Sequence, residues 1–117
     1  MMFWKIRRFV LNIPYRVRSI VFRLRHGFSI EDVWNLDDAT ARFLSARLLY
    51  LAENTSGYPS EFDGEDGDEV WIAILFKMAD GFERMTAPNW DSFVQEEMDY
   101  AKECLDLFRE YFFNLWD

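Results

Sequence analysis

The sequence predicts an all-α protein, a small helical bundle of about four to five helices with a basic N-terminal helical arm. Apolar residues recur at helical spacing in several stretches, segments containing Gly and Pro separate these stretches, and no strong pair of strand-like segments occurs. With 117 residues, half of them hydrophobic, the chain can bury a core without disulfides or metal. We therefore expect one domain spanning residues 1–117.

The charges are divided unevenly along the chain. Residues 1–28 carry seven basic residues and no acidic one, whereas residues 29–117 carry six basic and all 21 acidic residues, a net charge of −15. This division indicates either a basic arm that binds phosphate groups or a basic segment that packs against the chain's own acidic surface. We therefore distinguish a basic N-terminal arm, residues 1–28, from an acidic helical body, residues 29–117.

The first predicted helix covers residues 1–12 and stops before Pro14, because the residue before a proline avoids helical dihedral angles. Its basic and apolar residues would suit the surface of an anionic membrane, with Trp4 and Phe9 at the interface. The alternative is a helix that packs on the rest of the protein or on another subunit. We expect this second arrangement rather than membrane binding.

The second predicted helix covers residues 15–26. Its apolar stripe follows the i, i+3, i+4, i+7 spacing and consists of Val17, Ile20, Val21 and Leu24. The alternation of residues 15–18 would also suit a strand, but the apolar run at residues 20–22 breaks the alternation and favours a helix.

Four arginines flank this stripe, with Arg18 and Arg25 on one side and Arg16 and Arg23 on the other. Each guanidinium group can give two hydrogen bonds to an oxyanion, so together they could clamp phosphate groups. The alternative is that the arginines lie along the edge of the core and pair with acidic residues.

A hinge joins the basic arm to the acidic body. Gly27 suits the left-handed conformation that ends many helices, and Ser29 with Asp32 resembles a capping box in which Asp replaces the usual Glu. A short helix is expected to follow over residues 30–35.

Three longer helices are predicted in the acidic body, over residues 36–53, 69–85 and 90–116, the last being the longest. Asp68 is expected to cap the second of them, and Gly81 is a weak point inside it, at a cost of about 1 kcal/mol relative to Ala. The predicted core faces of the three helices include Leu36, Thr40, Phe43, Leu44, Leu48 and Leu51; Val70, Ala73, Ile74, Lys77, Met78 and Phe82, widened by Trp71 and Leu75; and Phe93, Glu97, Ala101, Cys104, Leu105, Phe108, Phe112 and Leu115.

The loop over residues 54–68 is rich in acidic residues and glycine, as calcium-binding loops are. Neither Gly64 nor Gly67 has the Asp that an EF-hand requires five residues earlier, so we expect a solvated loop and no metal. His26 is the only histidine, and Cys104 lies on an apolar helix face. No phosphate-binding loop and no Cys/His metal spacing occurs. We therefore predict no catalytic residue and no cofactor.

Other features suggest the setting of the protein. A single cysteine favours a reducing compartment, no run of 18 apolar residues is present, and the N-terminus lacks a signal peptide, so we expect a cytoplasmic protein. Twelve Phe and five Trp are many for this length, and residues 111–117 form an aromatic cluster. We expect this cluster to dock on the N-terminal segment or on another subunit of a homo-oligomer.

Three motifs stand out: the hinge residues His26, Gly27, Phe28, Ser29, Asp32, Trp34, Leu36 and Asp37; the turn Gly57, Tyr58 and Pro59; and the ending from Tyr111 to Asp117. In these motifs the chain resembles a group of small uncharacterised bacteriophage and prophage proteins. The resemblance implies a virus-encoded protein that acts inside a bacterial host cell. Small phage proteins without enzyme motifs commonly inhibit host machinery, including immunity.

These observations predict a non-enzymatic binding protein, with a role in counter-defence, that sequesters an anionic, nucleotide-like ligand or blocks a host protein. The expected ligand-binding residues are Arg16, Arg18, Arg23, Arg25 and His26 for phosphate groups, with Trp34 and Tyr58 for stacking on a base. The alternative is a nucleic-acid-associated protein, or an acidic mimic of DNA that inhibits a DNA-binding host factor.

Overall fold

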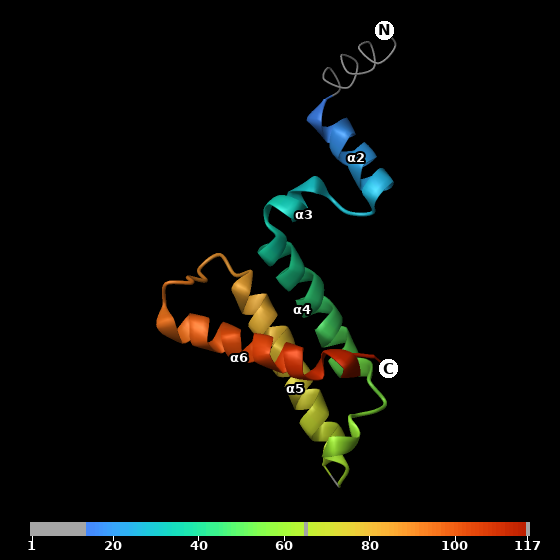
Figure 1. The fold of residues 1–117 in the computed structure, drawn as a ribbon, viewed down its shortest axis with the longest axis vertical. Helices are drawn as coiled ribbons and strands as arrows, with labels where there is room; N and C mark the ends of the chain where they lie inside the picture. Colours follow the sequence, from blue (N-terminus) through green and yellow to red (C-terminus); the bar gives the residue numbers. More distant parts are fainter. Residues whose placement is uncertain (1–13, 65, 117) are drawn as a thin grey trace. The chain divides into compact units, whose positions relative to one another are not determined.

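The computed structural model describes residues 14–64 and 66–116, which form five α-helices and two short 3-10 helices (Figure 1). No strand occurs among these residues, so the predicted all-α fold class is confirmed. The helix predicted over residues 1–12 lies outside the described residues. The chain divides into two compact units, Met1–Ala39 and Thr40–Asp117. None of the helices in the described part is both long enough and apolar enough to cross a lipid bilayer.

The first unit contains α2 (Tyr15–His26) and α3 (Ile30–Trp34), within one residue of the predicted bounds. Pro14 precedes α2, where a missing N–H group does no harm because the first N–H groups of a helix have no partner within it. Gly27 follows α2 with a φ of 80°, and its N–H donates to the carbonyl oxygen of Arg23 at 2.8 Å. The predicted left-handed end of this helix is therefore confirmed.

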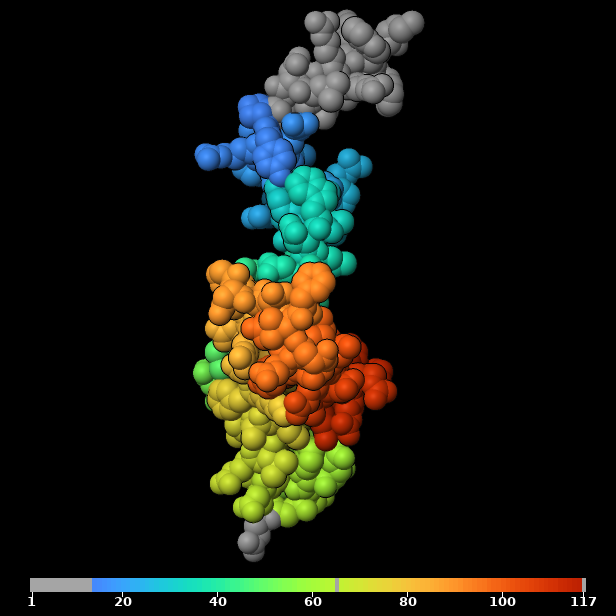
Figure 2. All heavy atoms as spheres, turned by 90° about the vertical axis from the view of Figure 1, so that its left-hand side faces the viewer, coloured from blue at the N-terminus to red at the C-terminus, as the bar shows by residue number. Residues whose placement is uncertain are grey.

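The second unit is built from α4 (Leu36–Asn54), most of which belongs to it, α5 (Gly67–Met85) and α6 (Gln95–Tyr111). The 3-10 helix η1 (Ser60–Phe62) lies in the loop before α5, and η2 (Phe112–Asn114) follows α6. In this unit α4 and α5 run side by side in opposite directions, and α6 crosses α5 (Figure 1). Figure 2 shows α6, drawn in orange, lying over α5, drawn in yellow.

The predicted long helix over residues 90–116 is wrong at both ends. The helix begins at Gln95, because side chains engage the backbone donors of the preceding turn: Asp91 Oδ1 accepts a hydrogen bond from the N–H of Phe93 (2.9 Å), and Glu97 Oε2 accepts one from the N–H of Asp91 (2.6 Å). Such local bonds offer the backbone an alternative to helix. At 17 residues, α6 is shorter than α4 and α5, which have 19 each.

The start of α5 also differs from the prediction. The helix begins two residues earlier than expected, with Asp66 at the N-cap position and no side-chain cap. Asp68 lies inside the first turn, where its carboxylate accepts a hydrogen bond from the N–H of Glu69 at 2.9 Å. The predicted capping role of Asp68 is therefore wrong, although its charge still lies at the helix end that favours anions.

One continuous core joins the three helices of the second unit. Its buried residues are Ala41, Leu48 and Ala52 from α4; Trp71, Leu75, Met78, Ala79 and Phe82 from α5; and Tyr111 from the end of α6. The predicted faces are wrong in part, since Phe43 is exposed and Phe93 is 94% exposed, while Tyr111 is buried. Phe93 is exposed because it lies in the turn before α6 rather than on the helix.

α5 and α6 cross in close contact at Gly81 and Cys104. A Cβ atom at Gly81 would lie 2.2 Å from the Sγ atom and 2.5 Å from the Cβ atom of Cys104. Both residues are buried. The glycine that looked like a weak point in the sequence is therefore the residue that allows this crossing.

The C-terminal aromatic cluster is divided between core and surface. Tyr111 is buried, with its ring centroid 5.4 Å from that of Trp71. Phe112 and Phe113 are exposed, and their rings pack edge to face at a centroid distance of 5.3 Å. The expectation that the cluster docks on the N-terminal segment or on another subunit stays a prediction.

Candidate functional site

Glu31 links the start of α3 to the start of α2. Its carboxylate accepts hydrogen bonds from the hydroxyl groups of Ser29 and Tyr15. Both hydrogen bonds lower the pKa of Glu31, and the bond from Ser29 contributes most. The positive charge of Arg23 lowers this pKa further. The hydrogen bond to Glu31 in turn raises the pKa of Tyr15. Two hydroxyl groups thus hold one carboxylate at the junction of the two helices.

Ser29 occupies the N-cap position of α3, but the predicted capping box with Asp32 does not form. The Ser29 hydroxyl donates to Glu31, while the N–H of Asp32 donates to the backbone carbonyl of Ser29 at 3.1 Å. A capping box would need the side chain of Ser29 to accept that N–H. The serine therefore joins the junction of α2 and α3 and does not cap α3 through its side chain.

The four arginines predicted to bind a ligand all lie on α2, and their side chains are exposed. Within residues 14–64 and 66–116, the side chains of Arg16, Arg18, Arg23 and Arg25 form no hydrogen bond and no ion pair. The helix itself carries no acidic residue. The side chains that α2 itself contributes to the surface are therefore positively charged or neutral.

The face of α2 that meets α3 in a shared groove carries Tyr15, Arg18, Ser19 and Phe22, and not the predicted apolar stripe. The stripe is present, but its four residues are exposed, Leu24 to 81%. The ring of Phe22 instead packs at centroid distances of 4.1 Å from His26 and 5.7 Å from Phe28. His26 therefore belongs to an aromatic cluster at the hinge.

Arg18 and Trp34 line the same groove in the first unit. The groove lies between α2 and α3 and has a volume of about 310 Å³. Its lining consists of Tyr15, Arg18, Ser19, Phe22, Ile30 and Trp34. Since Trp34 is 64% exposed, its ring is open to a ligand. The structure thus brings together one cation and one aromatic side chain from the predicted ligand-binding set.

Tyr58, the remaining member of the predicted set, belongs to the second unit. It lines a separate cavity there with Trp71 and Trp116. The seven predicted residues therefore do not form one site within either unit. Sequence spacing could not reveal that Tyr58 lies apart from the other predicted residues, because the position of its loop depends on the direction of the long helix that precedes it.

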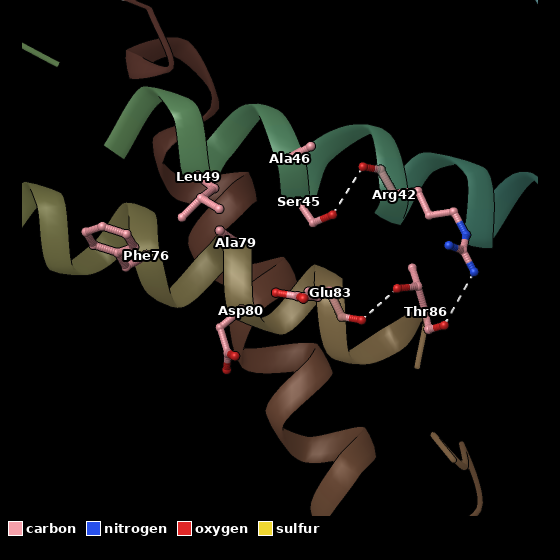
Figure 3. A pocket seen from close by; sticks show the side chains of 9 residues that line it. All are labelled: Arg42, Ser45, Ala46, Leu49, Phe76, Ala79, Asp80, Glu83 and Thr86. Atoms are coloured by element: carbon pink, nitrogen blue, oxygen red, sulfur yellow. Dashed lines mark hydrogen bonds between the residues drawn. The ribbon is translucent and has the colours of Figure 1, made fainter. Parts of the chain in front are cut away.

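A larger groove of about 590 Å³, which was not predicted, lies between α4 and α5 (Figure 3). At one end, the guanidinium group of Arg42 donates to the carbonyl oxygen of Thr86 at 3.5 Å, and Glu83 lies nearby. Leu49 and Phe76 line the other end (Figure 3). Its charged lining residues are one cation, Arg42, and two carboxylates, Asp80 and Glu83.

The only cysteine, Cys104, is a buried thiol at the crossing of α5 and α6. Burial raises its pKa, and Sγ lies 3.5 Å from the carbonyl oxygen of Lys77. A thiol in this setting is a small apolar group and not a nucleophile. In the part of the chain that the structure describes, no group of three or more His, Cys, Asp and Glu side chains could hold a metal ion.

Comparison with known proteins adds no further constraint on the function. No protein-family model, no curated protein and no solved structure matches the chain.

Proposed function

We propose that this protein binds an anionic, nucleotide-like ligand through the arginines of α2 and the ring of Trp34, and that it holds the ligand without converting it. One observation carries the proposal: Arg18 and Trp34 line one groove between α2 and α3. A guanidinium fork suits phosphate oxygens, and an exposed indole ring suits stacking on a base.

The charge of α2 supports this proposal. Four exposed arginines lie on a helix of 12 residues that has no acidic member. Because no described residue forms an ion pair with Arg18, an incoming anion does not have to displace a carboxylate from this arginine. Charge-assisted hydrogen bonds to oxyanions are about twice as strong as neutral ones.

The Glu31 junction supports a preformed groove. Its hydrogen bonds to Ser29 and Tyr15 hold α3 against α2 at the end of the groove that Tyr15 lines. A ligand that binds between helices already held together loses less free energy to ordering them. In the phage setting that the resemblance implies, such a protein would act in counter-defence by sequestering a nucleotide signal of the host.

Isothermal titration of the full chain tests this proposal, with ATP, a cyclic dinucleotide and inorganic triphosphate as probes. We expect at least one nucleotide to bind, and to be recovered intact after denaturation of the protein. Arg18→Ala should weaken binding by about 10- to 100-fold, since a hydrogen bond to a charged group contributes about 1.5–3 kcal/mol. Trp34→Ala should weaken nucleotide binding by a similar factor, since base stacking contributes about 1–3 kcal/mol, and should leave binding of triphosphate unchanged.

Arg109→Ala provides the matched control, because Arg109 is an exposed arginine in the last turn of α6, outside the first unit. This variant should bind like the unmodified protein. Binding that is equal in the Arg18 and Arg109 variants, binding of none of the three probes, or release of a cleaved nucleotide would contradict the proposal.

A further inference from the structure

The second unit carries an aromatic cavity that the proposed anion site does not use. The cavity has a volume of about 200 Å³ and lies between the loop after α4 and the chain after α6. Its lining includes Gly57, Tyr58 and Pro59 from the loop, Trp71 from α5, and Asn114 and Trp116 from the C-terminal segment. The segment Gly57-Tyr58-Pro59 and the C-terminal ending, which stand far apart in the sequence, thus line one cavity.

Two of the three aromatic walls are fixed by packing. Trp71 is 2% exposed and packs edge to face on Tyr111. The ring of Tyr58 stands over Gly67, where an added Cβ atom would lie 2.6 Å from the ring. Trp116, which is 75% exposed, forms the outer wall. The cavity therefore offers a ligand the phenol ring of Tyr58, which packing holds in place, and the exposed indole ring of Trp116, while the buried Trp71 belongs to the core behind them.

The loop that supplies most of the lining is acidic. Its described residues 55–64 contain Glu61 and Asp63 and no basic residue, and the C-terminal lining segment, residues 112–116, carries no charge. Burial raises the pKa of Tyr111, and the carboxylates of Glu110 and Glu61 raise it further. Tyr111 packs on Trp71, so these two carboxylates act on the packing partner of a residue that lines the cavity.

We infer that this cavity binds the guanidinium or ammonium group of an arginine or lysine from a basic partner protein. Aromatic faces attract cations, and neighbouring carboxylates strengthen that attraction while they repel anions. Pockets for drug-sized ligands span about 300–1,000 Å³, so a cavity of about 200 Å³ suits one side chain and not a nucleotide.

NMR titration of the ¹⁵N-labelled full chain tests this inference, with three blocked tripeptides as probes: Gly-Arg-Gly, Gly-norleucine-Gly and Gly-Glu-Gly. We expect the arginine peptide to shift the indole N–H signal of Trp116 and the amide signal of Gly57 in a saturable way. Its dissociation constant should be at least tenfold lower than that of the norleucine peptide, which is similar in length but uncharged. The glutamate peptide should cause no shift.

Trp116→Ala should abolish the shift of the Gly57 signal. Phe113→Ala is the matched control, since Phe113 is an exposed aromatic residue of the same segment that does not line the cavity. Equal binding of the arginine and norleucine peptides would show an apolar pocket and overturn the inference. So would the absence of a shift with the arginine peptide, or a shift that survives in the Trp116 variant. None of these readouts involves α2, so the result is independent of the proposed anion site.

Discussion

Replacing Gly81 by alanine is expected to destabilise the second unit, although alanine is the better helix former. At an exposed position the change would stabilise a helix by about 1 kcal/mol. At Gly81 the new Cβ atom would lie 2.2 Å from Sγ and 2.5 Å from Cβ of Cys104, whereas carbon atoms in contact lie about 3.5–4.0 Å apart. A Cβ atom cannot rotate away, so α5 and α6 would have to separate by about 1 Å or more.

The net effect follows from two opposing contributions. Overpacking a core costs about 1–3 kcal/mol, and the upper end applies because two helices must move together with their neighbours. Subtracting the gain in helix propensity leaves a loss of about 2 kcal/mol in the free energy of unfolding. With an m-value of about 2 kcal/mol/M, the midpoint of urea unfolding, followed by circular dichroism, should fall by about 1 M.

Gly57→Ala is the matched control, because a Cβ atom there would have no neighbour within 4 Å. It should leave the midpoint unchanged or raise it slightly, through the lower entropy of the unfolded chain. Adding Cys104→Gly to Gly81→Ala removes both clashing atoms, so the two changes should couple by more than about 1 kcal/mol in a double-mutant cycle. A Gly81→Ala variant as stable as the Gly57→Ala variant would refute the tight crossing.

Three further predictions concern acid stability, thiol reactivity and the core. The pKa of Glu31 is lowered in the folded state, chiefly by the hydroxyl of Ser29, so the contribution of Glu31 to stability is present above its unfolded pKa and is lost as the pH falls through its folded pKa. Glu31→Gln should remove this part of the acid dependence of unfolding, measured by circular dichroism. An unchanged pH profile would argue against the junction of α2 and α3. Cys104 is buried, with a raised pKa, so its thiol should react with a disulfide reagent only as fast as the protein opens, and rapid labelling of the native protein would contradict its burial. Phe82→Ala should lower the free energy of unfolding by about 3–5 kcal/mol, because Phe82 is buried in the core. Phe93→Ala, at a residue 94% exposed, should change it by less than about 0.5 kcal/mol. Equal losses for the two variants in chemical denaturation would refute the assigned core.

The positions of most helices follow from local signals that the sequence contains. α2 begins after Pro14 and ends at Gly27, and both residues act within a few bonds of their own backbone. α5 ends at Met85 as predicted, two residues before the Ala87-Pro88-Asn89 turn. Such signals predict a helix end without knowledge of the rest of the fold.

The faces of the helices were harder to predict, because they depend on partners that are distant in the sequence. Hydrophobic periodicity favoured Phe43 and Phe93 for the core, but the helices pack through small residues such as Ala41 and Gly81, which permit close approach. Periodicity counts apolar side chains and assigns little weight to a glycine. The start of α6 was also missed, since the side chain of Asp91 accepts a hydrogen bond from the N–H of Phe93, and this bond competes with helix formation.

The candidate site likewise has features that local sequence signals predict and features that depend on distant parts of the chain. The four arginines could be placed on α2 from their spacing alone, because they lie within one helix. That Arg18 shares a groove with Trp34 depends on the turn at Gly27, which folds α3 back on α2. That Tyr58 instead lines a cavity with Trp116 depends on the whole second unit, and no local pattern could predict it.

Native mass spectrometry of the full chain, purified from bacterial cells with an activated nucleotide-based defence, tests the central claim most directly. The proposed function predicts a bound small anionic mass that is absent when Arg16, Arg18, Arg23 and Arg25 are all replaced by alanine in a variant that keeps its helical circular dichroism. The exposed positions of these side chains make such a folded variant feasible. A protein without any bound small molecule, or one that carries the same mass after the four replacements, would contradict the claim.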